Sequence, residues 1–137
     1  MLEHARDALL AAWQADRELL HKLRELTARI RIDLASEAFD LSAEGGMPVA
    51  ITEPAGDAAI TIRAPQAFWD QALVQNPARG FETLSAGGMH GAVTEGPFLE
   101  LVAPYQGALQ RLFIVLRETV AGKTPRQAIG PGAASGG

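Results

Sequence analysis

Histidine is the residue type in this sequence with the widest chemical scope, because imidazole exchanges protons and binds metals near neutral pH. The chain has three histidines, which are His4, His21 and His90. His4 and His21 fall on the polar side of one predicted helix, too far apart to share a metal ion, whereas His90 stands alone among glycines. The sequence therefore predicts no metal site. His90 is kept as the acid/base group of an alternative hypothesis, a small cavity enzyme.

Serine, carboxylate and glycine patterns give no catalytic signature. Ser85 lies in Leu-Ser-Ala-Gly-Gly, which is not the Gly-x-Ser-x-Gly turn of a hydrolase nucleophile. The glycines of residues 80–96 follow neither the dinucleotide-binding pattern nor the Walker pattern. Asp16 falls on the apolar side of the first predicted helix. A bond to a neighbouring backbone amide is its simplest role, although in the enzyme alternative it is a second acid/base candidate. Since the chain also has no cysteine, we predict no catalytic residue and no cofactor.

Length and charge exclude further classes of function. The chain has 137 residues and a formal net charge of -4, with basic residues mixed among acids, so it offers no counter-surface for nucleic acid. Its longest strongly apolar run, residues 112–116, falls far below the ~20 residues needed to cross a bilayer. The first residues lack the pattern of a secretory signal. We therefore expect a soluble, cytoplasmic protein with no integral membrane segment.

The feature that remains is a surplus of apolar side chains near the C-terminal end. Between residues 101 and 120, apolar side chains cover roughly 160° of a helix, against the ≳100° stripe of a helix with one buried face. A sheet could cover one side of this arc, and an apolar ligand or a partner chain the other. A closed core would suit the same residues. The residues predicted to line a ligand pocket are Phe68, Trp69, Phe81, Met89, Leu99, Leu109, Leu112, Phe113 and Leu116.

The periodicity of apolar residues predicts the elements that must position these side chains. We expect one domain over residues 1–121 of α+β class, with a long N-terminal helix. Its five-stranded, mainly antiparallel sheet is covered on one face by helices and encloses an apolar cavity. The predicted segments are an N-terminal helix (1–27), an antiparallel β-meander of four strands (28–63), a helix (65–75), a fifth strand (89–95), a C-terminal helix (98–121) and a disordered tail (122–137).

This order of segments resembles the sterol carrier protein type two family of lipid-binding domains over residues 30–120. In that family a strand of alternating Thr and apolar residues leads into a helix, as residues 57–69 do (Asp-Ala-Ala-Ile-Thr-Ile-Arg-Ala-Pro-Gln-Ala-Phe-Trp). Residues 77–80 resemble its Pro-containing connector. Residues 91–96 (Gly-Ala-Val-Thr-Glu-Gly) and 99–116 resemble its last strand and C-terminal helix. The resemblance implies that the C-terminal helix roofs an apolar tunnel that holds a hydrophobic ligand.

The chain departs from the family pattern at the end of that strand. Gly96-Pro97 stands where the family has Gly-Asp, and Ala92 and Thr94 stand where basic residues are often seen. The long first helix resembles bacterial-type relatives, in which such domains accompany enzymes that act on hydrophobic substrates. The resemblance therefore implies an apolar ligand in a tunnel rather than a sterol in particular.

Three hypotheses follow. The first is non-enzymatic binding or carriage of a lipid, fatty acyl chain or sterol/terpenoid-like molecule. The second is an interaction or accessory subunit that forms a homodimer or docks on an enzyme partner through its apolar helices. Ile114 favours the second hypothesis, because it points away from the main apolar arc. The third is the small cavity enzyme with His90 as its acid/base group.

Overall fold

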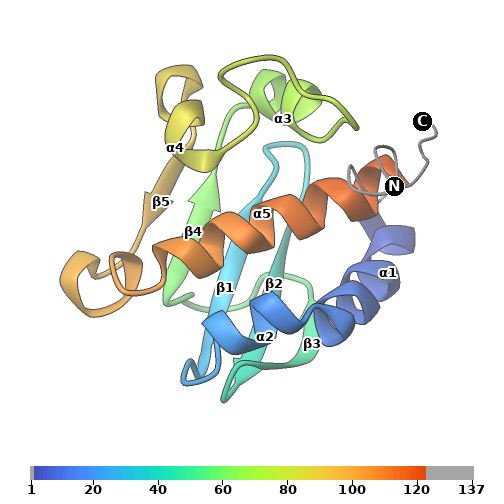
Figure 1. Ribbon diagram of the computed structural model, residues 1–137. Helices are drawn as coiled ribbons and strands as arrows, with labels where there is room; N and C mark the ends of the chain where they lie inside the picture. Colours follow the sequence, from blue (N-terminus) through green and yellow to red (C-terminus); the bar gives the residue numbers. More distant parts are fainter. Residues whose placement is uncertain (1, 123–137) are drawn as a thin grey trace.

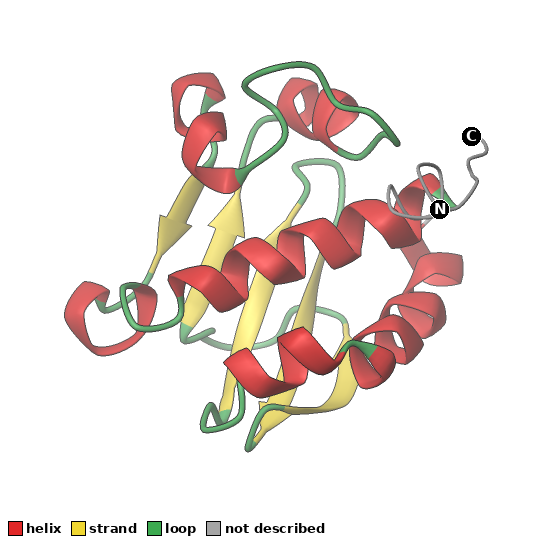
Figure 2. Cartoon of the chain, in the orientation of Figure 1, coloured by secondary structure: helices red, strands yellow, loops and turns green. Residues whose placement is uncertain are grey.

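A five-stranded sheet forms one layer of the molecule, and helices α1, α2 and α5 lie across one of its faces (Figure 1). This computed structural model describes residues 2–122, with side chains from residue 6 onward, so the predicted tail beyond residue 122 lies outside the described residues. Figure 2 distinguishes the layer of strands from the helices that cover it.

The strands are β1 (Ala28–Asp33), β2 (Ala38–Glu44), β3 (Met47–Thr52), β4 (Ile60–Arg63) and β5 (Val93–Glu95). The helices are α1 (Leu2–Ala15), α2 (Arg17–Lys22), α3 (Gln66–Ala72), α4 (Leu84–Gly87), the 3₁₀ helix η1 (Gly88–His90), the π-helix η2 (Phe98–Val102) and α5 (Gln106–Ala121).

Alternation of apolar and polar residues gives the sheet one packed face. Ile30 and Ile32 of β1 are buried, and each lies between an apolar partner on β2 and another on β4. Burial of each such side chain contributes about 1.5–3 kcal/mol relative to leaving it in water. The resulting cross-strand rows are Leu41–Ile30–Ile60 and Phe39–Ile32–Ile62.

The strand order is β3-β2-β1-β4-β5, and β4 pairs in parallel with β1. The predicted meander over residues 28–63 describes β1, β2 and β3, but the structure differs at β4. The reason is the connector of residues 53–59, which crosses the sheet on the face opposite the helices. β4 therefore pairs with the edge of β1 that faces away from β2. The pairings β1–β2, β2–β3 and β4–β5 are antiparallel, so the sheet is mainly antiparallel as predicted.

A buried carboxylate fastens this connector. Asp40 has no exposed surface and accepts hydrogen bonds from Arg31 Nε at 2.7 Å and from the Ala55 N–H at 3.1 Å. Arg31 also donates to the Gly56 carbonyl at 2.8 Å, and Arg29 Nη1 lies 3.3 Å from the Asp40 carboxylate. Burial raises the pKa of Asp40, but the hydrogen bonds from Arg31 and Ala55 and the charges of both arginines outweigh it. The pKa therefore lies below its ordinary value.

The predicted N-terminal helix over residues 1–27 is divided at Asp16. The backbone of Asp16 is extended (φ -92°, ψ 99°), and its carboxylate accepts a hydrogen bond from the Leu19 N–H at 2.8 Å. Aspartate is a favoured N-cap residue because its side chain satisfies an N–H at the helix start that has no partner within the helix. The bond to a neighbouring amide expected of Asp16 is therefore present, and it starts α2 as a separate helix.

The predicted C-terminal helix over residues 98–121 is divided as well. The π-helix η2 is followed by a turn that contains Pro104, and α5 begins two residues later. Proline has no N–H to donate, which favours such a break. α5 ends where Gly122 adopts a left-handed conformation, φ +82°, which glycine takes without steric cost. The structured parts of the predicted segments 65–75 and 89–95 are shorter, since α3 ends at Ala72 and residues 88–90 form η1.

Candidate functional site

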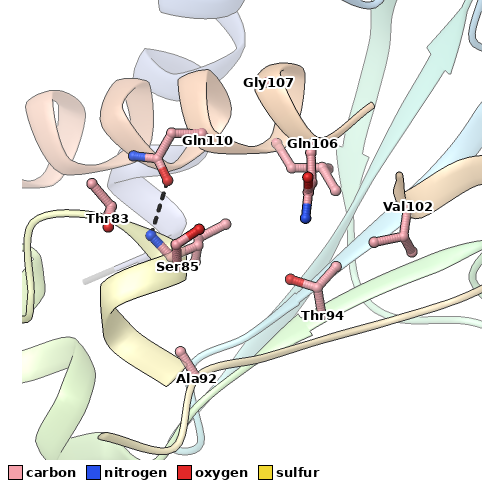
Figure 3. A pocket seen from close by; sticks show the side chains of 10 residues that line it. Thr83, Ser85, Ala92, Thr94, Val102, Gln106, Gly107 and Gln110 are labelled. Carbon is pink, nitrogen blue, oxygen red and sulfur yellow. Dashed lines mark hydrogen bonds between the residues drawn. The ribbon is translucent and has the colours of Figure 1, made fainter. Parts of the chain in front are cut away.

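A cavity of about 430 Å³ opens beside the first two turns of α5 (Figure 3). Its walls come from α4, from β5 and the residue before it, from η2 and from α5. The volume falls within the ~300–1,000 Å³ of typical small-molecule sites. No charged side chain belongs to the wall that these described residues form. The lining residues are Thr83, Leu84, Ser85, Ala92, Thr94, Val102, Gln106, Gly107, Leu109 and Gln110.

The α4 wall is fixed at both of its ends. The Thr83 hydroxyl caps α4 by accepting a hydrogen bond at 3.0 Å from the N–H three residues later. Gln110 Oε1 of α5 accepts a hydrogen bond from the Leu84 N–H at 2.9 Å, as Figure 3 shows. At the other end, a Cβ on Gly87 would lie 2.5 Å from Cε1 of Phe68. Glycine at residue 87 therefore allows α4 to lie directly against the Phe68 ring of α3.

The wall opposite α4 begins where the chain leaves β5. Gly96 has φ +151°, and a Cβ at this position would lie 2.8 Å from the Ala59 carbonyl oxygen. The chain therefore passes close to the start of β4 before it enters η2. Val102 of η2 is buried and lines the cavity. Phe98 and Leu99, in the first turn of η2, are 59% and 77% exposed. η2 thus presents one apolar side chain to the cavity and two to solvent.

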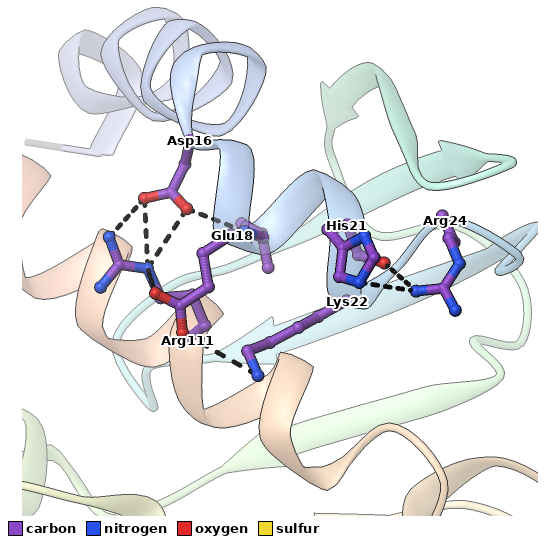
Figure 4. Close-up of polar contacts among 7 residues, drawn as sticks. Asp16, Glu18, His21, Lys22, Arg24 and Arg111 are labelled. Atoms are coloured by element: carbon purple, nitrogen blue, oxygen red, sulfur yellow. Dashed lines mark hydrogen bonds and ion pairs between the residues drawn. The ribbon is translucent and has the colours of Figure 1, made fainter.

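An ion pair fastens α5 to the break between α1 and α2 (Figure 4). Arg111 is 8% exposed, and its Nη2 donates to the Asp16 carboxylate at 2.6 Å while its Nε lies 3.2 Å from both carboxylate oxygens. Glu18 adds a contact at 3.7 Å. The hydrogen bond to Asp16 raises the pKa of Arg111 above its ordinary value. The pair therefore fixes the middle of α5, at the residue that follows Gln110 of the cavity wall.

A second buried arginine joins α5 to the segment that precedes α4. Arg117 donates from Nε to the Ala72 carbonyl at 2.8 Å, and from Nη2 to the carbonyls of Phe81 at 3.0 Å and Glu82 at 2.8 Å. Its guanidinium carbon lies 5.0 Å from the centre of the Phe113 ring, within cation–π range. Burial lowers the pKa of Arg117, although the neighbouring carboxylates oppose the shift. Arg117 therefore acts as a tether for the chain between α3 and α4.

Solved structures share this arrangement of sheet and helices. The crystal structure of sterol carrier protein 2 matches with a TM-score of 0.62 and 21% identity, over 82% of this chain and 92% of that chain. The chain has the fold of sterol carrier protein 2. The solution structure of a conserved hypothetical protein from Thermus thermophilus, described as possibly a sterol carrier protein, matches with a TM-score of 0.61 and 20% identity, over 88% and 89%. The UbiJ-SCP2 ubiquinone synthesis protein matches with a TM-score of 0.48 and 15% identity, over 83% and 86%. Comparison of the sequence with family models and with curated proteins finds no match.

The sterol carrier protein 2 fold confirms the α+β class predicted from the sequence, but the space beneath α5 is filled. The void there measures about 10 Å³, no more than the ~10–15 Å³ that a single water needs. The expected apolar tunnel is thus not open in this structure. The reason is that α1 and α2 pack against α5 beside the sheet and cover the second side of its wide apolar arc. The void is lined by Leu9, Ile32, Leu41, Ile62, Trp69, Leu112, Phe113 and Leu116.

Among the predicted pocket residues, the structure places Leu109 on the wall of the large cavity. Phe68 and Trp69 belong to an aromatic cluster with Phe113, in which the ring centres lie 5.3–6.2 Å apart. Trp69 Nε1 also donates to the carbonyl oxygens of Asp33 and Ala64. These aromatic residues therefore join α3 and α5 to the sheet. Leu112 and Leu116 are buried with them in the core.

The remaining predicted pocket residues lie away from the cavity wall. Met89 is 91% exposed on η1, and Leu99 is exposed on η2. Phe81 is half-buried between the rings of Phe68, at 5.7 Å, and His90, at 4.2 Å. Met89 lies on the 3₁₀ helix η1, where a strand was predicted, and Leu99 lies on the first turn of η2, within the predicted C-terminal helix but facing solvent.

The residues of the alternative hypotheses also have defined positions. The exposed ring of His90 stacks on Phe81, and the carboxylate of Asp16 is engaged with α2 and Arg111. Ile114 is half-buried on α5. Within residues 2–122 no three histidine or carboxylate side chains gather closely enough to hold a metal ion. In the same range no helix has both the length and the apolar character needed to cross a bilayer.

The polar half of the cavity wall is what sequence reasoning missed. Gln106 and Gln110 are four residues apart and therefore share a face of α5, which is a signal the sequence does contain. Ser85 and Thr94 carry no such signal, because a polar residue in a loop or an edge strand normally faces solvent. Their convergence depends on how α4 and β5 pack, which periodicity does not predict.

Proposed function

We propose that this chain binds a hydrophobic small molecule non-covalently in the cavity beside α5. Lipids, fatty acyl derivatives and terpenoid-like molecules are the candidate ligands. The observation that carries the proposal is a cavity of about 430 Å³ against the C-terminal helix of a sterol carrier protein 2 fold. The matched proteins support a ligand of this type, since one is sterol carrier protein 2 and the other is described as possibly a sterol carrier protein.

The apolar part of the wall supplies the driving force. Leu84, Ala92, Val102 and Leu109 would cover ligand surface that otherwise faces water. Burial of ~200 Å² of apolar ligand surface contributes about 5 kcal/mol at ~25 cal/mol per Å², before the entropic cost of association. Apolar contact carries little directional information, so we expect broad selectivity for the ligand's hydrocarbon part.

Leu109 marks the route by which a longer ligand would reach the core. It lines the cavity, while Leu112 and Phe113, one turn further along α5, line the small void beneath the helix. Close-packed interiors accept added volume only by moving side chains. A ligand longer than the cavity would therefore displace Leu109 and Leu112 and open the predicted tunnel in the bound state.

The test is titration of the purified chain with Nile red, an uncharged fluorescent probe. Leu84→Trp places a larger side chain at a half-buried position on the cavity wall and should weaken Nile red binding at least tenfold. Leu101→Trp is the matched control, because Leu101 is also half-buried but does not line the cavity. The proposal fails if the wild-type chain does not bind Nile red, or if both tryptophan variants bind it as the wild type does.

Native mass spectrometry separates this function from the interaction-module alternative. A monomer that carries small hydrophobic adducts supports ligand binding. A dimer free of adducts would instead favour an accessory role in which a second copy covers the apolar helices.

A further inference from the structure

Three polar side chains from three different elements converge on the cavity. Ser85 belongs to α4, Thr94 to β5 and Gln106 to α5. In Figure 3 the Gln106 amide reaches from α5 toward the hydroxyl of Thr94 on the opposite wall. None of the three side chains makes a hydrogen bond to another described residue. By contrast, the side chains of Thr83 and Gln110 are engaged in holding α4.

The polar part of the wall is neutral. Nearby charged groups already have partners outside it: Arg63 pairs with Glu95 on the sheet, and Lys22 lies 4.0 Å from Glu18. Lys22 approaches α5 at Gly107, where its ammonium would lie 3.8 Å from an added Cβ, yet it does not line the cavity. The wall therefore offers an anion no cation of its own, and its hydroxyl and amide groups match a neutral polar group better.

We propose that Ser85, Thr94 and Gln106 form a polar subsite that binds an uncharged oxygen-bearing group, an alcohol or a carbonyl, at one end of an amphiphile. This inference rests on the proposed function and adds the chemical class of the ligand. Two hydroxyls and one amide offer both donors and acceptors, so they match a hydroxyl or carbonyl oxygen without any fixed charge. The ligand's hydrocarbon part then lies against Leu109.

The subsite is tested with three ten-carbon probes that compete with Nile red at pH 8. These are 1-decanol, decanoate and 1-chlorodecane, which differ in whether the end group is a neutral hydrogen-bonding group, an anion or a neutral group without a hydroxyl. An uncharged chain enters any apolar space more readily than an anion does. The comparison of 1-decanol with 1-chlorodecane in the variants is therefore the decisive measurement.

Thr94→Val and Gln106→Leu remove polar atoms with little change in shape. Each should weaken 1-decanol binding about threefold to fivefold, the size of one neutral hydrogen bond, and leave 1-chlorodecane within twofold of wild type. Thr61→Val on the neighbouring strand β4 and Gln71→Leu on α3 are matched controls outside the cavity wall, and should change neither affinity. In the wild-type chain, 1-decanol should bind at least tenfold more tightly than decanoate.

Two results would overturn the subsite while the proposed function stands. One is decanoate binding as tightly as 1-decanol. The other is equal loss of 1-decanol and 1-chlorodecane affinity, or no loss of either, in Thr94→Val and Gln106→Leu. If Nile red does not bind, or if none of the three probes displaces it, the proposed function and the subsite both fail.

Discussion

The Asp16 carboxylate contacts Arg111 at 2.6 Å and the Leu19 N–H at 2.8 Å, so one side chain both starts α2 and holds α5. The two charged residues are separated by 95 positions in the chain. Because both are largely buried, removal of either charge leaves the other without its main partner, which is strongly destabilising in such pairs.

Asp16→Asn should lower the free energy of unfolding by about 2–4 kcal/mol, because asparagine keeps an oxygen for the Leu19 N–H but leaves Arg111 without a carboxylate. Adding Arg111→Met should restore part of this loss. Urea denaturation of the two single variants and the double variant measures the coupling. Glu18→Gln is the control and should cost less than about 0.5 kcal/mol, since Glu18 is 52% exposed and 3.7 Å from Arg111. Additive single effects would contradict the coupling.

Asp40 should make the chain sensitive to acid. Its pKa in the folded state lies below the unfolded value of ~3.9, so its contribution to stability is complete above about pH 4 and is lost as pH falls through the folded pKa. Asp40→Asn should destabilise the protein by about 2–4 kcal/mol at pH 7 and lose less stability than the wild type between about pH 4 and pH 2. Thermal denaturation across this range is the measurement. Ser42→Ala, on the same strand, should keep the acid-dependent loss of the wild type.

Gly87 and Gly88 form a matched pair at the α4 wall. Gly87→Ala places a Cβ 2.5 Å from the Phe68 ring and should destabilise the protein by about 1–3 kcal/mol, because the packed ring must move. It should also weaken Nile red binding, since α4 lines the cavity. Gly88→Ala meets no atom within 4 Å and has helical backbone angles, so it should be neutral or stabilising by up to about 1 kcal/mol. Equal effects of the two substitutions would contradict the packing described for α4.

Arg117→Met should loosen the segment between α3 and α4. The variant loses hydrogen bonds to the carbonyls of Ala72, Phe81 and Glu82, and the buried carbonyls are left without these donors. Faster amide hydrogen exchange in residues 73–83 is the expected readout. Arg117→Lys keeps the charge but lacks the planar fork, and should show most of the same effect. Arg17→Met, at an exposed position on α2, should leave exchange in this segment unchanged.

The sequence predicted the fold class because its periods are clear. Alternation around Ile30 and Ile32 indicated the strands, and the i,i+3 and i,i+4 spacing indicated the helices. The position of β4 could not be predicted in the same way. A short connector is typical of a hairpin, and the crossover depends on the buried contact of Asp40 with Ala55, which no local pattern reveals.

The candidate site was predicted less well than the fold. The wide apolar arc of α5 predicts pocket residues along this helix, yet α1 and α2 cover that arc. A single-sequence pattern gives the width of an apolar face but not the number of neighbours that share it. The polar residues that line the cavity instead, such as Thr94 and Gln106, resemble ordinary surface residues in the sequence.

The parallel pairing of β1 with β4 also bears on the order of folding. The β1–β2–β3 unit joins neighbours in the chain, whereas Ile30 meets Ile60 only after a much longer loop has closed. Closing a long loop costs conformational entropy before the contacts between its ends are made. We therefore expect the three-stranded unit to be formed already in the transition state of folding. The strands that complete the cavity, together with α5, would then dock late.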